Sequence, residues 1–531
     1  MDTDLASIQN VRTLVETAKQ AQKAFKTFSQ AQVDQIVAAM VEAGAHAAER
    51  LAMMAHEETG FGRVESKTAK NRFATTTLLE RMRGMKTVGV IRKLENDTIW
   101  EIATPMGVVG ALIPSTNPTS TAMYKAIIAA KARCGIVMSP HPRGKACTLE
   151  ALRIVAQAAY KAGVPEGLFG CMSTVTLEGT NALLEHPKVD LILATGGSAM
   201  VKAAYSKGKP AYGVGSGNVP VYVDRSANLQ KAAADILYGT SFDWGTLCST
   251  ERSIIADQPV KAKLLAALQA EGGYLMNETE KDQLRRMLLV KGRLNTEQVG
   301  QSPERIAQMA GFRVPAGTKA LIGEVSEVGK TEPLSMETLS PILAFFTEDG
   351  WQAGCERCIQ VLYFGGIGHT LALHASNQRV IEAFAMEKPS MRIVVNTVAA
   401  LGSVGYTTNL FPAMTLGPGT LGGSITSDNV SPMHLLNVKR LAFETNPVNT
   451  VSPAHAAMAL PSGVRASASN GKGWMADVEA NLLARAGNPA VRAPKAKTSV
   501  PKATSPSATK PSDNSLGEQQ IQALIRRFRK G

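Results

Sequence analysis

The sequence predicts an α/β fold with mainly parallel sheets. From about residue 108 onward, short apolar runs alternate with Ala-rich segments of helical periodicity. This alternation is typical of repeated β-α-β units. The chain has 531 residues, 44% of them hydrophobic and 19% charged. Its length allows two to four domains with large cores, and its composition is that of a globular protein rather than a disordered chain.

The elements of the first half follow in chain order. Residues 7–76 are Ala-rich with helical periodicity and few turn signals, which predicts two or three helices. The alternating pattern of residues 91–104 predicts strands. After these, strands are expected at 108–113, 135–138 and 190–194, and helices at 120–133, 145–162 and 198–206.

A second α/β block is expected to begin near Cys248. Its predicted strands are 253–255, 343–346 and 392–395, and a helix is expected at 260–269. Residues 411–429 are rich in Gly, Thr and Ser and have no clear periodicity. A loop-rich segment of this kind usually lines a site or an interface.

Charge and cysteine usage narrow the class of protein. Nine Lys or Arg and two acidic residues fall in 486–531, so this tail carries +7 of the net charge of +13. The rest of the chain is therefore not expected to bind nucleic acid. Six cysteines without a dense framework indicate a reducing, cytosolic compartment. The sequence has no apolar run of about 18 residues and no signal peptide, so no membrane span is expected.

The C-terminal region changes in character. Residues 448–514 are rich in Pro, Ala, Ser and Lys, which predicts a flexible linker. Residues 515–531 are expected to form a short amphipathic helix, with Ser515 and Glu518 at capping-box spacing. Its apolar stripe consists of Ile521, Leu524, Ile525 and Phe528. Such a helix suits a membrane surface, a neighbouring subunit or a groove on a partner.

The stretch Ser241-Phe-Asp-Trp-Gly-Thr-Leu-Cys-Ser-Thr-Glu251 sets Cys248 among small, hydroxylated and glycine residues. A thiol in so tight a turn is expected to lie near backbone N–H groups, which lower its pKa and can hold a developing oxyanion. Such a nucleophile suits carbonyl chemistry that passes through a thioester. The alternative is a buried structural cysteine.

Two further segments are candidates for a site. Asn117, in Ile113-Pro-Ser-Thr-Asn-Pro118, offers a neutral amide donor for an alkoxide, and the alternative is a turn residue before proline, which is common. Thr195, Gly196 and Gly197 follow a strand and open a helix, where phosphate or ribose binds. They do not form a Gly-x-Gly-x-x-Gly fingerprint.

These motifs, in this order and spacing, resemble those of acylating, coenzyme A-dependent aldehyde dehydrogenases, including the microcompartment-associated type. The likeness runs from about residue 8 to about residue 445. It implies a Rossmann-type, NAD-binding domain at 1–240 that includes the N-terminal helices, and an α/β catalytic domain at 241–430. A small return or oligomerisation segment is implied at 431–447.

The resemblance also implies roles for residues. Cys248 matches the nucleophile and Asn117 the oxyanion donor. Glu337 matches the residue whose carboxylate accepts the hydroxyls of the nicotinamide ribose, and the alternative is a solvated surface glutamate. In the hydrolytic branch a glutamate base stands where this chain has Gly213-Val-Gly-Ser-Gly-Asn218, which includes Gly215 and has no carboxylate. The residues expected to meet the adenosine end of the cofactor are Ser139, Pro140, His141 and Arg143, which leave NAD versus NADP open but favour NAD.

His369 lies in a glycine-rich loop, Gly365-Gly-Ile-Gly-His-Thr370, that resembles the loop of the acylating group. It is expected either to assist proton transfer in the thiol step or to be a structural loop histidine. No metal site is expected.

The implied reaction converts a short aldehyde, NAD and coenzyme A into acyl-CoA and NADH, with acetaldehyde and propionaldehyde as first choices. Three alternatives stay open: a sulfoacetaldehyde substrate, a hydrolytic enzyme that yields the free acid, and a non-catalytic shell-binding protein. The tail resembles an encapsulation peptide, which implies microcompartment shell proteins as partners and a cytoplasmic location inside a bacterial microcompartment. A homo-oligomer is expected as well.

Overall fold

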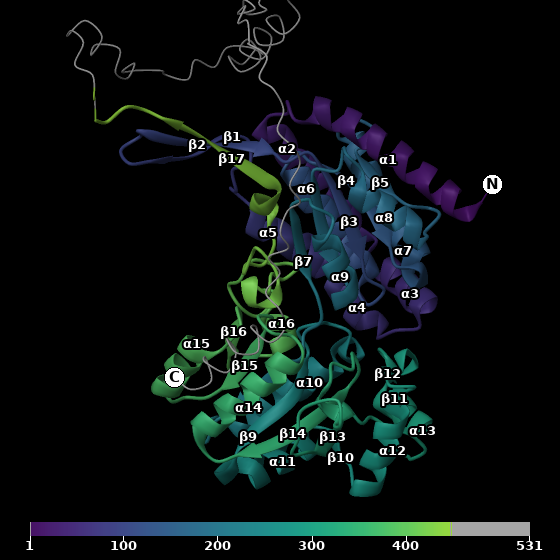
Figure 1. Ribbon diagram of the computed structural model, residues 1–531, viewed down its shortest axis with the longest axis vertical. Helices are drawn as coiled ribbons and strands as arrows, with labels where there is room; N and C mark the ends of the chain where they lie inside the picture. Colours follow the sequence, from purple (N-terminus) through teal and green to yellow (C-terminus); the bar gives the residue numbers. More distant parts are fainter. Residues whose placement is uncertain (1, 447, 449–531) are drawn as a thin grey trace, which may run out of the picture. The chain divides into compact units, whose positions relative to one another are not determined.

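The computed structural model describes residues 2–446 and 448. Residues 1–448 form one compact unit that contains three main sheets, two of them parallel. The α/β fold with mainly parallel sheets is therefore confirmed (Figure 1). The predicted linker and C-terminal helix lie outside the described residues.

The first parallel sheet has the strand order β5-β4-β3-β6-β7. Its strands are β3 (Val108–Ile113), β4 (Gly135–Pro140), β5 (Phe169–Cys171), β6 (Leu191–Thr195) and β7 (Ala211–Val214). Every residue of β3 and β4 is buried, as expected for parallel strands covered on both faces. The connecting helices are α6 (Pro118–Lys131), α7 (Lys145–Lys161), α8 (Leu177–Glu185) and α9 (Ser198–Tyr205).

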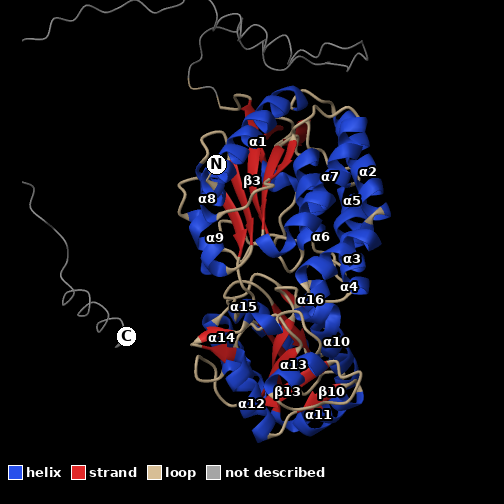
Figure 2. Cartoon of the chain, turned by 90° about the vertical axis from the view of Figure 1, so that its right-hand side faces the viewer, coloured by secondary structure: helices blue, strands red, loops and turns tan. Residues whose placement is uncertain are grey.

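The side chains of β3 alternate between two cores. Val109, Ala111 and Ile113 pack in the core that includes residues of α6 and α7. Val108 and Leu112 pack on the opposite face, with residues of α1 and α8. Figure 2 shows this sheet between the two helical layers. The period of two in a strand thus divides one apolar run between both faces.

The N-terminal segment forms more helices than expected. Four α-helices precede residue 73 where two or three were predicted: α1 (Thr3–Phe25), α2 (Gln30–His46), α3 (Ala48–Thr59) and α4 (Val64–Arg72). Ser29 forms a capping box that starts α2, and Gly60 ends α3 in the left-handed conformation. One π-turn (Phe73–Thr77) and α5 (Leu78–Met82) follow.

The second parallel sheet has the order β10-β13-β14-β9-β8-β15-β16. Its strands are β8 (Val219–Val223), β9 (Glu251–Asp257), β10 (Gly273–Leu275), β13 (Ala320–Glu324), β14 (Ile342–Glu348), β15 (Leu371–His374) and β16 (Ile393–Val395). Its helices are α10 (Leu229–Ser241), α11 (Lys261–Ala270), α12 (Glu278–Leu288), α13 (Pro303–Ala310), α14 (Gly350–Phe364), α15 (Gln378–Glu387) and α16 (Ala399–Gly402). A short hairpin joins β11 (Leu289–Val290) to β12 (Arg293–Leu294).

The chain enters this sheet at β8, earlier than the start near Cys248 that the sequence indicates. Both β8 and α10 precede Cys248 and pack in the core of the second sheet. The predicted domain limits at residues 240, 430, 447 and 514 stay predictions. The third sheet is antiparallel and joins β1 (Gly89–Leu94), β2 (Ile99–Pro105) and β17 (Leu436–Ala442).

The arrangement of strand ends determines where a site can form. The carboxyl ends of β3, β4, β6 and β7 are followed by the segments around Asn117, His141, Thr195 and Gly215. Ligands of open α/β sheets bind at this edge. Within residues 2–446, none of the helices is both long and apolar enough to span a membrane.

We predict that Gly62→Ala destabilises the protein more than Gly60→Ala does. Both glycines have positive φ, +70° at Gly60 and +72° at Gly62, so each substitution is expected to cost about 1–2 kcal/mol. A Cβ at Gly62 would lie 2.0 Å from Oδ1 of the buried Asp243, whereas nothing lies within 4 Å at Gly60. Urea denaturation followed by circular dichroism measures both variants. Equal losses would show that the Asp243 contact does not constrain position 62.

Candidate active site

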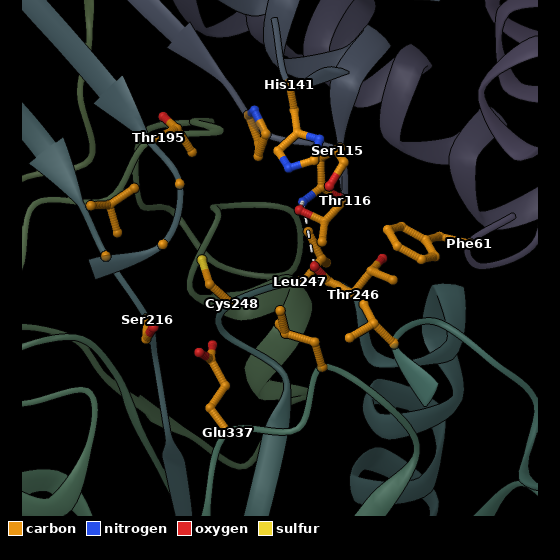
Figure 3. A pocket seen from close by; sticks show the side chains of 18 of the residues that line it. Phe61, Ser115, Thr116, His141, Thr195, Ser216, Thr246, Leu247, Cys248 and Glu337 are labelled. Atoms are coloured by element: carbon orange, nitrogen blue, oxygen red, sulfur yellow. Dashed lines mark hydrogen bonds between the residues drawn. The ribbon is translucent and has the colours of Figure 1, made fainter. Parts of the chain in front are cut away.

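A cavity of about 540 Å³ lies where the carboxyl ends of the first parallel sheet meet the segments that lead into β9 and β14. Figure 3 shows the side chains that converge on it, among them Cys248 and Glu337. Nine residues predicted for the site line this cavity: Asn117, His141, Arg143, Thr195, Gly196, Gly197, Gly215, Cys248 and Glu337. The structure therefore brings together residues that are up to 220 positions apart in the sequence.

Cys248 follows a tight turn, Phe242–Gly245, in which Asp243 and Trp244 have φ values of 50° and 48°. Its free thiol is half-buried. Burial and the nearby carboxylate of Glu337 raise the thiol pKa to about 12, against smaller opposing effects of Arg392 and the residue's own backbone N–H. The expected lowering of this pKa is wrong, because burial outweighs the local donors.

Glu337 belongs to the loop that leads into β14. One carboxylate oxygen accepts a hydrogen bond from the backbone N–H of Gly217 at 2.9 Å. Burial raises the pKa of this carboxyl to about 7, while Arg252 and the Gly217 N–H act in the opposite direction. Glu337 therefore changes charge near neutral pH, and in its ionised form it opposes ionisation of Cys248.

Asn117 directly precedes α6, at the carboxyl end of β3. Its Oδ1 accepts a hydrogen bond from the ammonium of Lys70 at 2.5 Å. Its Nδ2 lies 3.1 Å from Oγ1 of Thr116 and 3.4 Å from the carbonyl oxygen of Thr246. Sequence reasoning found Asn117 but missed Lys70, because a lysine in the polar helix α4 carries no local sign of burial.

Two buried arginines lie near the thiol and were also missed. Arg392 donates to the carbonyl oxygens of Ser427 and Gly417, at 2.9 and 2.6 Å. Arg252 donates to the carbonyl oxygens of Gly245 and Ser340. Both guanidinium groups favour the ionised form of Cys248, although less strongly than burial and Glu337 oppose it.

The predicted nucleotide-binding residues lie on the wall formed by the first sheet. Thr195 Oγ1 is 2.9 Å from Thr415 Oγ1, and no atom lies within 4 Å of where a Cβ would stand at Gly196 or Gly197. These glycines directly precede α9. Open space, exposed backbone and a helix N-terminus fit a pyrophosphate or ribose, so this wall suits a dinucleotide.

Of the four residues predicted for the adenosine end of the cofactor, two line the cavity and two do not. His141 Nδ1 accepts a hydrogen bond from the backbone N–H of Arg143, and Arg143 forms an exposed ion pair with Glu297 at 3.3 Å. Ser139 and Pro140 are buried in β4 and do not line the cavity. Ser139 Oγ instead lies 2.9 Å from Thr180 Oγ1.

His369 is buried and does not line the cavity. Its Nδ1 lies 3.0 Å from Thr370 Oγ1, and Nε2 has no hydrogen-bond partner among the described residues. Burial and the nearby Arg392 lower its pKa to about 3, so the imidazole is neutral and a weak base. The ring lies behind Gly217, where a Cβ would come within 3.1 Å of Nδ1 and 2.2 Å of the Cys248 carbonyl oxygen.

The site is therefore a cavity that brings together a cysteine, an amide donor and a wall that suits a dinucleotide. Residues 1–282 match the aldehyde dehydrogenase family, which is more than half of the chain. The chain belongs to this family. It is 41% identical over 443 residues to the bifunctional aldehyde-alcohol dehydrogenase AdhE of Escherichia coli K12, covering 82% of this chain and 50% of AdhE.

A second relative is the sulfoacetaldehyde dehydrogenase (acylating) of Cupriavidus necator, with 38% identity over 82% of this chain and 90% of the relative. The chain spans about half the length of the first curated relatives it matches, which are aldehyde-alcohol dehydrogenases.

Solved structures give the same likeness. An acetylating aldehyde dehydrogenase from Geobacillus thermoglucosidasius has 48% identity and a TM-score of 0.83, covering 85% of this chain and all of that one. A propionaldehyde dehydrogenase from Rhodopseudomonas palustris, with bound CoA and an acylated cysteine, has 30% identity and a TM-score of 0.74, covering 82% and 97%. One from a fucose-utilisation microcompartment of Clostridium phytofermentans has 27% identity and a TM-score of 0.75, with the same coverage. The predicted resemblance to acylating aldehyde dehydrogenases is thus confirmed.

We predict that Glu337→Gln accelerates alkylation of Cys248 by iodoacetamide above pH 7 and leaves it unchanged at lower pH. The ionised carboxylate raises the thiol pKa, and this effect disappears when Glu337 is protonated below its pKa of about 7. A decrease of one unit in the thiol pKa raises the thiolate fraction about tenfold.

The rate is measured by mass spectrometry of the peptide that contains Cys248. Glu297→Gln, which removes an exposed carboxylate on the Arg143 side of the cavity, serves as the control and should leave the rate unchanged. A rate that falls in Glu337→Gln above pH 7 would contradict the charge effect.

Proposed function

We propose that the protein is an acylating aldehyde dehydrogenase, which converts a short aldehyde, NAD⁺ and coenzyme A into acyl-CoA, NADH and a proton. One observation carries this proposal. Cys248 lines a cavity in which Glu337 is the only carboxylate among the described lining residues, and that carboxylate is held by Gly217 N–H. Hydrolysis of a thioester needs a base that activates water. With Glu337 engaged in this way, a second thiol is the better acceptor of the acyl group.

In the proposed reaction the sulfur of Cys248 forms a bond to the aldehyde carbon, and the thiol proton leaves. Negative charge then develops on the former carbonyl oxygen, where the Nδ2 amide of Asn117 is the donor we assign to it. Loss of hydride from the same carbon leaves an acyl thioester on Cys248. The sulfur of coenzyme A then replaces Cys248 on the acyl carbon, and a proton returns to the Cys248 thiolate.

NAD⁺ fits the wall formed by Thr195, Gly196 and Gly197, because the open space at both glycines leaves the backbone accessible. When bound, it supplies the hydride acceptor. Glu337 is the residue we assign to the nicotinamide ribose, since its carboxylate lines the same cavity as Cys248. His141 and Arg143 are assigned to the adenosine end. Proton transfer by His369 stays a hypothesis, since its imidazole is a weak base in this state.

A smaller cavity of about 40 Å³ supports the choice of substrate. It shares Leu247, Val404 and Met414 with the main cavity, and the rest of its wall is largely aromatic or aliphatic. Lys70 is the only charged residue among the described ones that line it, and its ammonium already binds Asp243 and Asn117. We therefore propose an uncharged two- or three-carbon aldehyde, acetaldehyde or propionaldehyde, over the anionic sulfoacetaldehyde.

We also propose that residues 515–531 bind shell proteins and place the enzyme in the cytoplasm inside a bacterial microcompartment, as a homo-oligomer. Two facts support the shell proposal. The sequence of this tail has one apolar stripe at helical spacing behind a Pro- and Ala-rich linker. The similar enzyme from Clostridium phytofermentans is described as coming from a microcompartment.

We predict that purified protein forms acyl-CoA and NADH in equal amounts from acetaldehyde or propionaldehyde, and that turnover stops without coenzyme A. Without it, each active site should release at most one NADH, because the acyl group stays on Cys248. Absorbance at 340 nm and chromatography of the thioester measure both products. Cys248→Ala should abolish them, whereas Cys171→Ala, at a half-buried cysteine in β5, should not. Continued turnover to the free carboxylate without coenzyme A would identify a hydrolytic enzyme instead.

We predict that residues 511–531, fused to a fluorescent reporter, sediment with purified microcompartment shells. Leu524→Asp interrupts the apolar stripe and should release the reporter, while Gln522→Asp adds the same charge outside the stripe and should retain it. Sedimentation with lipid vesicles rather than shells would favour the membrane alternative. A reporter that stays in solution in both assays would eliminate the targeting role.

A further inference from the structure

A buried ion cluster lies directly beside the candidate site. It consists of Asp243, which has no exposed surface, and the ammonium groups of Lys67 and Lys70, both buried. Both ammonium groups donate hydrogen bonds to Oδ2 of Asp243. The same oxygen accepts a hydrogen bond from the hydroxyl of Thr246 at 2.5 Å. Its other oxygen accepts the backbone N–H of Arg63 at 2.7 Å. The cluster therefore joins α4 to the turn that leads to Cys248.

The two lysines differ in one respect that matters for chemistry. Lys67 contacts Asp243 at 3.2 Å, whereas Lys70 contacts Asp243 and also Oδ1 of Asn117, at 2.5 Å. A lysine ammonium has three donors and no acceptor. Its neighbour on Asn117 must therefore be the amide oxygen, which accepts its hydrogen bond, and Nδ2 faces the other way, toward Thr116 Oγ1 and the carbonyl oxygen of Thr246. A flipped amide would place N–H donors against an ammonium.

The charge of Lys70 has a second consequence. A hydrogen bond from a cation draws electron density away from an amide oxygen, and linked hydrogen bonds polarise one another in a buried environment. The N–H groups of Asn117 become stronger donors as a result. Asp243 supplies the negative charge without which a buried ammonium would be costly. Burial lowers the Lys70 pKa to about 8, and Asp243 opposes this shift, which keeps the ammonium form at neutral pH.

We propose that Lys70 is a positioning residue for the oxyanion donor: it fixes the orientation of the Asn117 amide and polarises its N–H groups toward the reacting carbonyl oxygen. The inference rests on the proposed role of Asn117 as that donor. It assigns a function to a lysine that does not line the main cavity with Cys248. It also explains why a charged side chain borders the apolar cavity in which the short aldehyde is proposed to sit.

The test uses acylation of Cys248 by 4-nitrophenyl acetate, which needs the thiol and the oxyanion donor but neither NAD nor coenzyme A. Lys70→Met and Lys67→Met each remove one ammonium partner of Asp243, so they are a matched pair. Loss of an oxyanion donor typically lowers the rate about 10²–10³-fold. We expect Lys70→Met to lose at least about tenfold in the acylation rate, and Lys67→Met to stay within about threefold of the unmodified protein.

A double-mutant cycle separates positioning from general damage. If Lys70 acts through Asn117, Lys70→Met has no further effect on the acylation rate in an Asn117→Ala background. Alkylation of Cys248 by iodoacetamide forms no oxyanion and should be equal in all four proteins. Lys70→Arg, which retains a cationic donor, should recover part of the rate and serves if Lys70→Met does not fold.

Several outcomes would overturn the proposal. These are multiplicative losses in the cycle, an equal loss in Lys67→Met, or a Lys70→Arg variant that folds but acylates no faster than Asn117→Ala. Because the readout needs no coenzyme A, failure of the protein to form acyl-CoA would reject the proposed function without changing this result.

Discussion

The carboxylate of Asp243 is the interaction on which the site depends. It compensates two buried ammonium groups and accepts hydrogen bonds from the Arg63 backbone and the Thr246 side chain. Through these contacts it anchors a turn whose Asp243 and Trp244 both have left-handed φ values. Such backbone costs energy and persists only where the surroundings fix it. Removing this carboxylate would leave two buried positive charges unpaired. The same carboxylate therefore stabilises the turn before Cys248 and the ammonium of Lys70, which donates to Asn117.

The second constraint is the balance of effects on the pKa of the Cys248 thiol. Arg252 and Arg392 favour the thiolate, but burial and Glu337 oppose it more strongly, so Cys248 is protonated in this state. Because the pKa of Glu337 is raised to about 7, its effect on the ionisation of Cys248 changes with pH near neutrality.

The sequence predicted those helices and strands that a short stretch of residues identifies by its own hydrophobic pattern. Buried strands such as β3 and β4 have continuous apolar runs, and their helices follow at regular spacing. Strand β8 was missed, because Pro220 weighs against a central strand; it is accommodated where the register of β8 and β9 shifts. The motifs identified Cys248, Asn117 and Glu337 as candidate site residues, and the fold brings all three into one cavity. Lys70 and Asp243 were not predicted as a pair, since only tertiary structure buries the polar helix α4 against the Cys248 turn.

The glycines near Cys248 restrict which side chains the wall of the cavity can carry. At Gly217 a Cβ would lie 2.2 Å from the Cys248 carbonyl oxygen, and at Gly215 it would lie 3.0 Å from Ser198 Oγ. Position 217 therefore cannot carry any side chain without moving the backbone of the nucleophile. The N–H of the same glycine also holds the carboxylate of Glu337. Close packing thus leaves no room for a side chain at position 217, and Glu337 is the one carboxylate among the described residues that line the cavity.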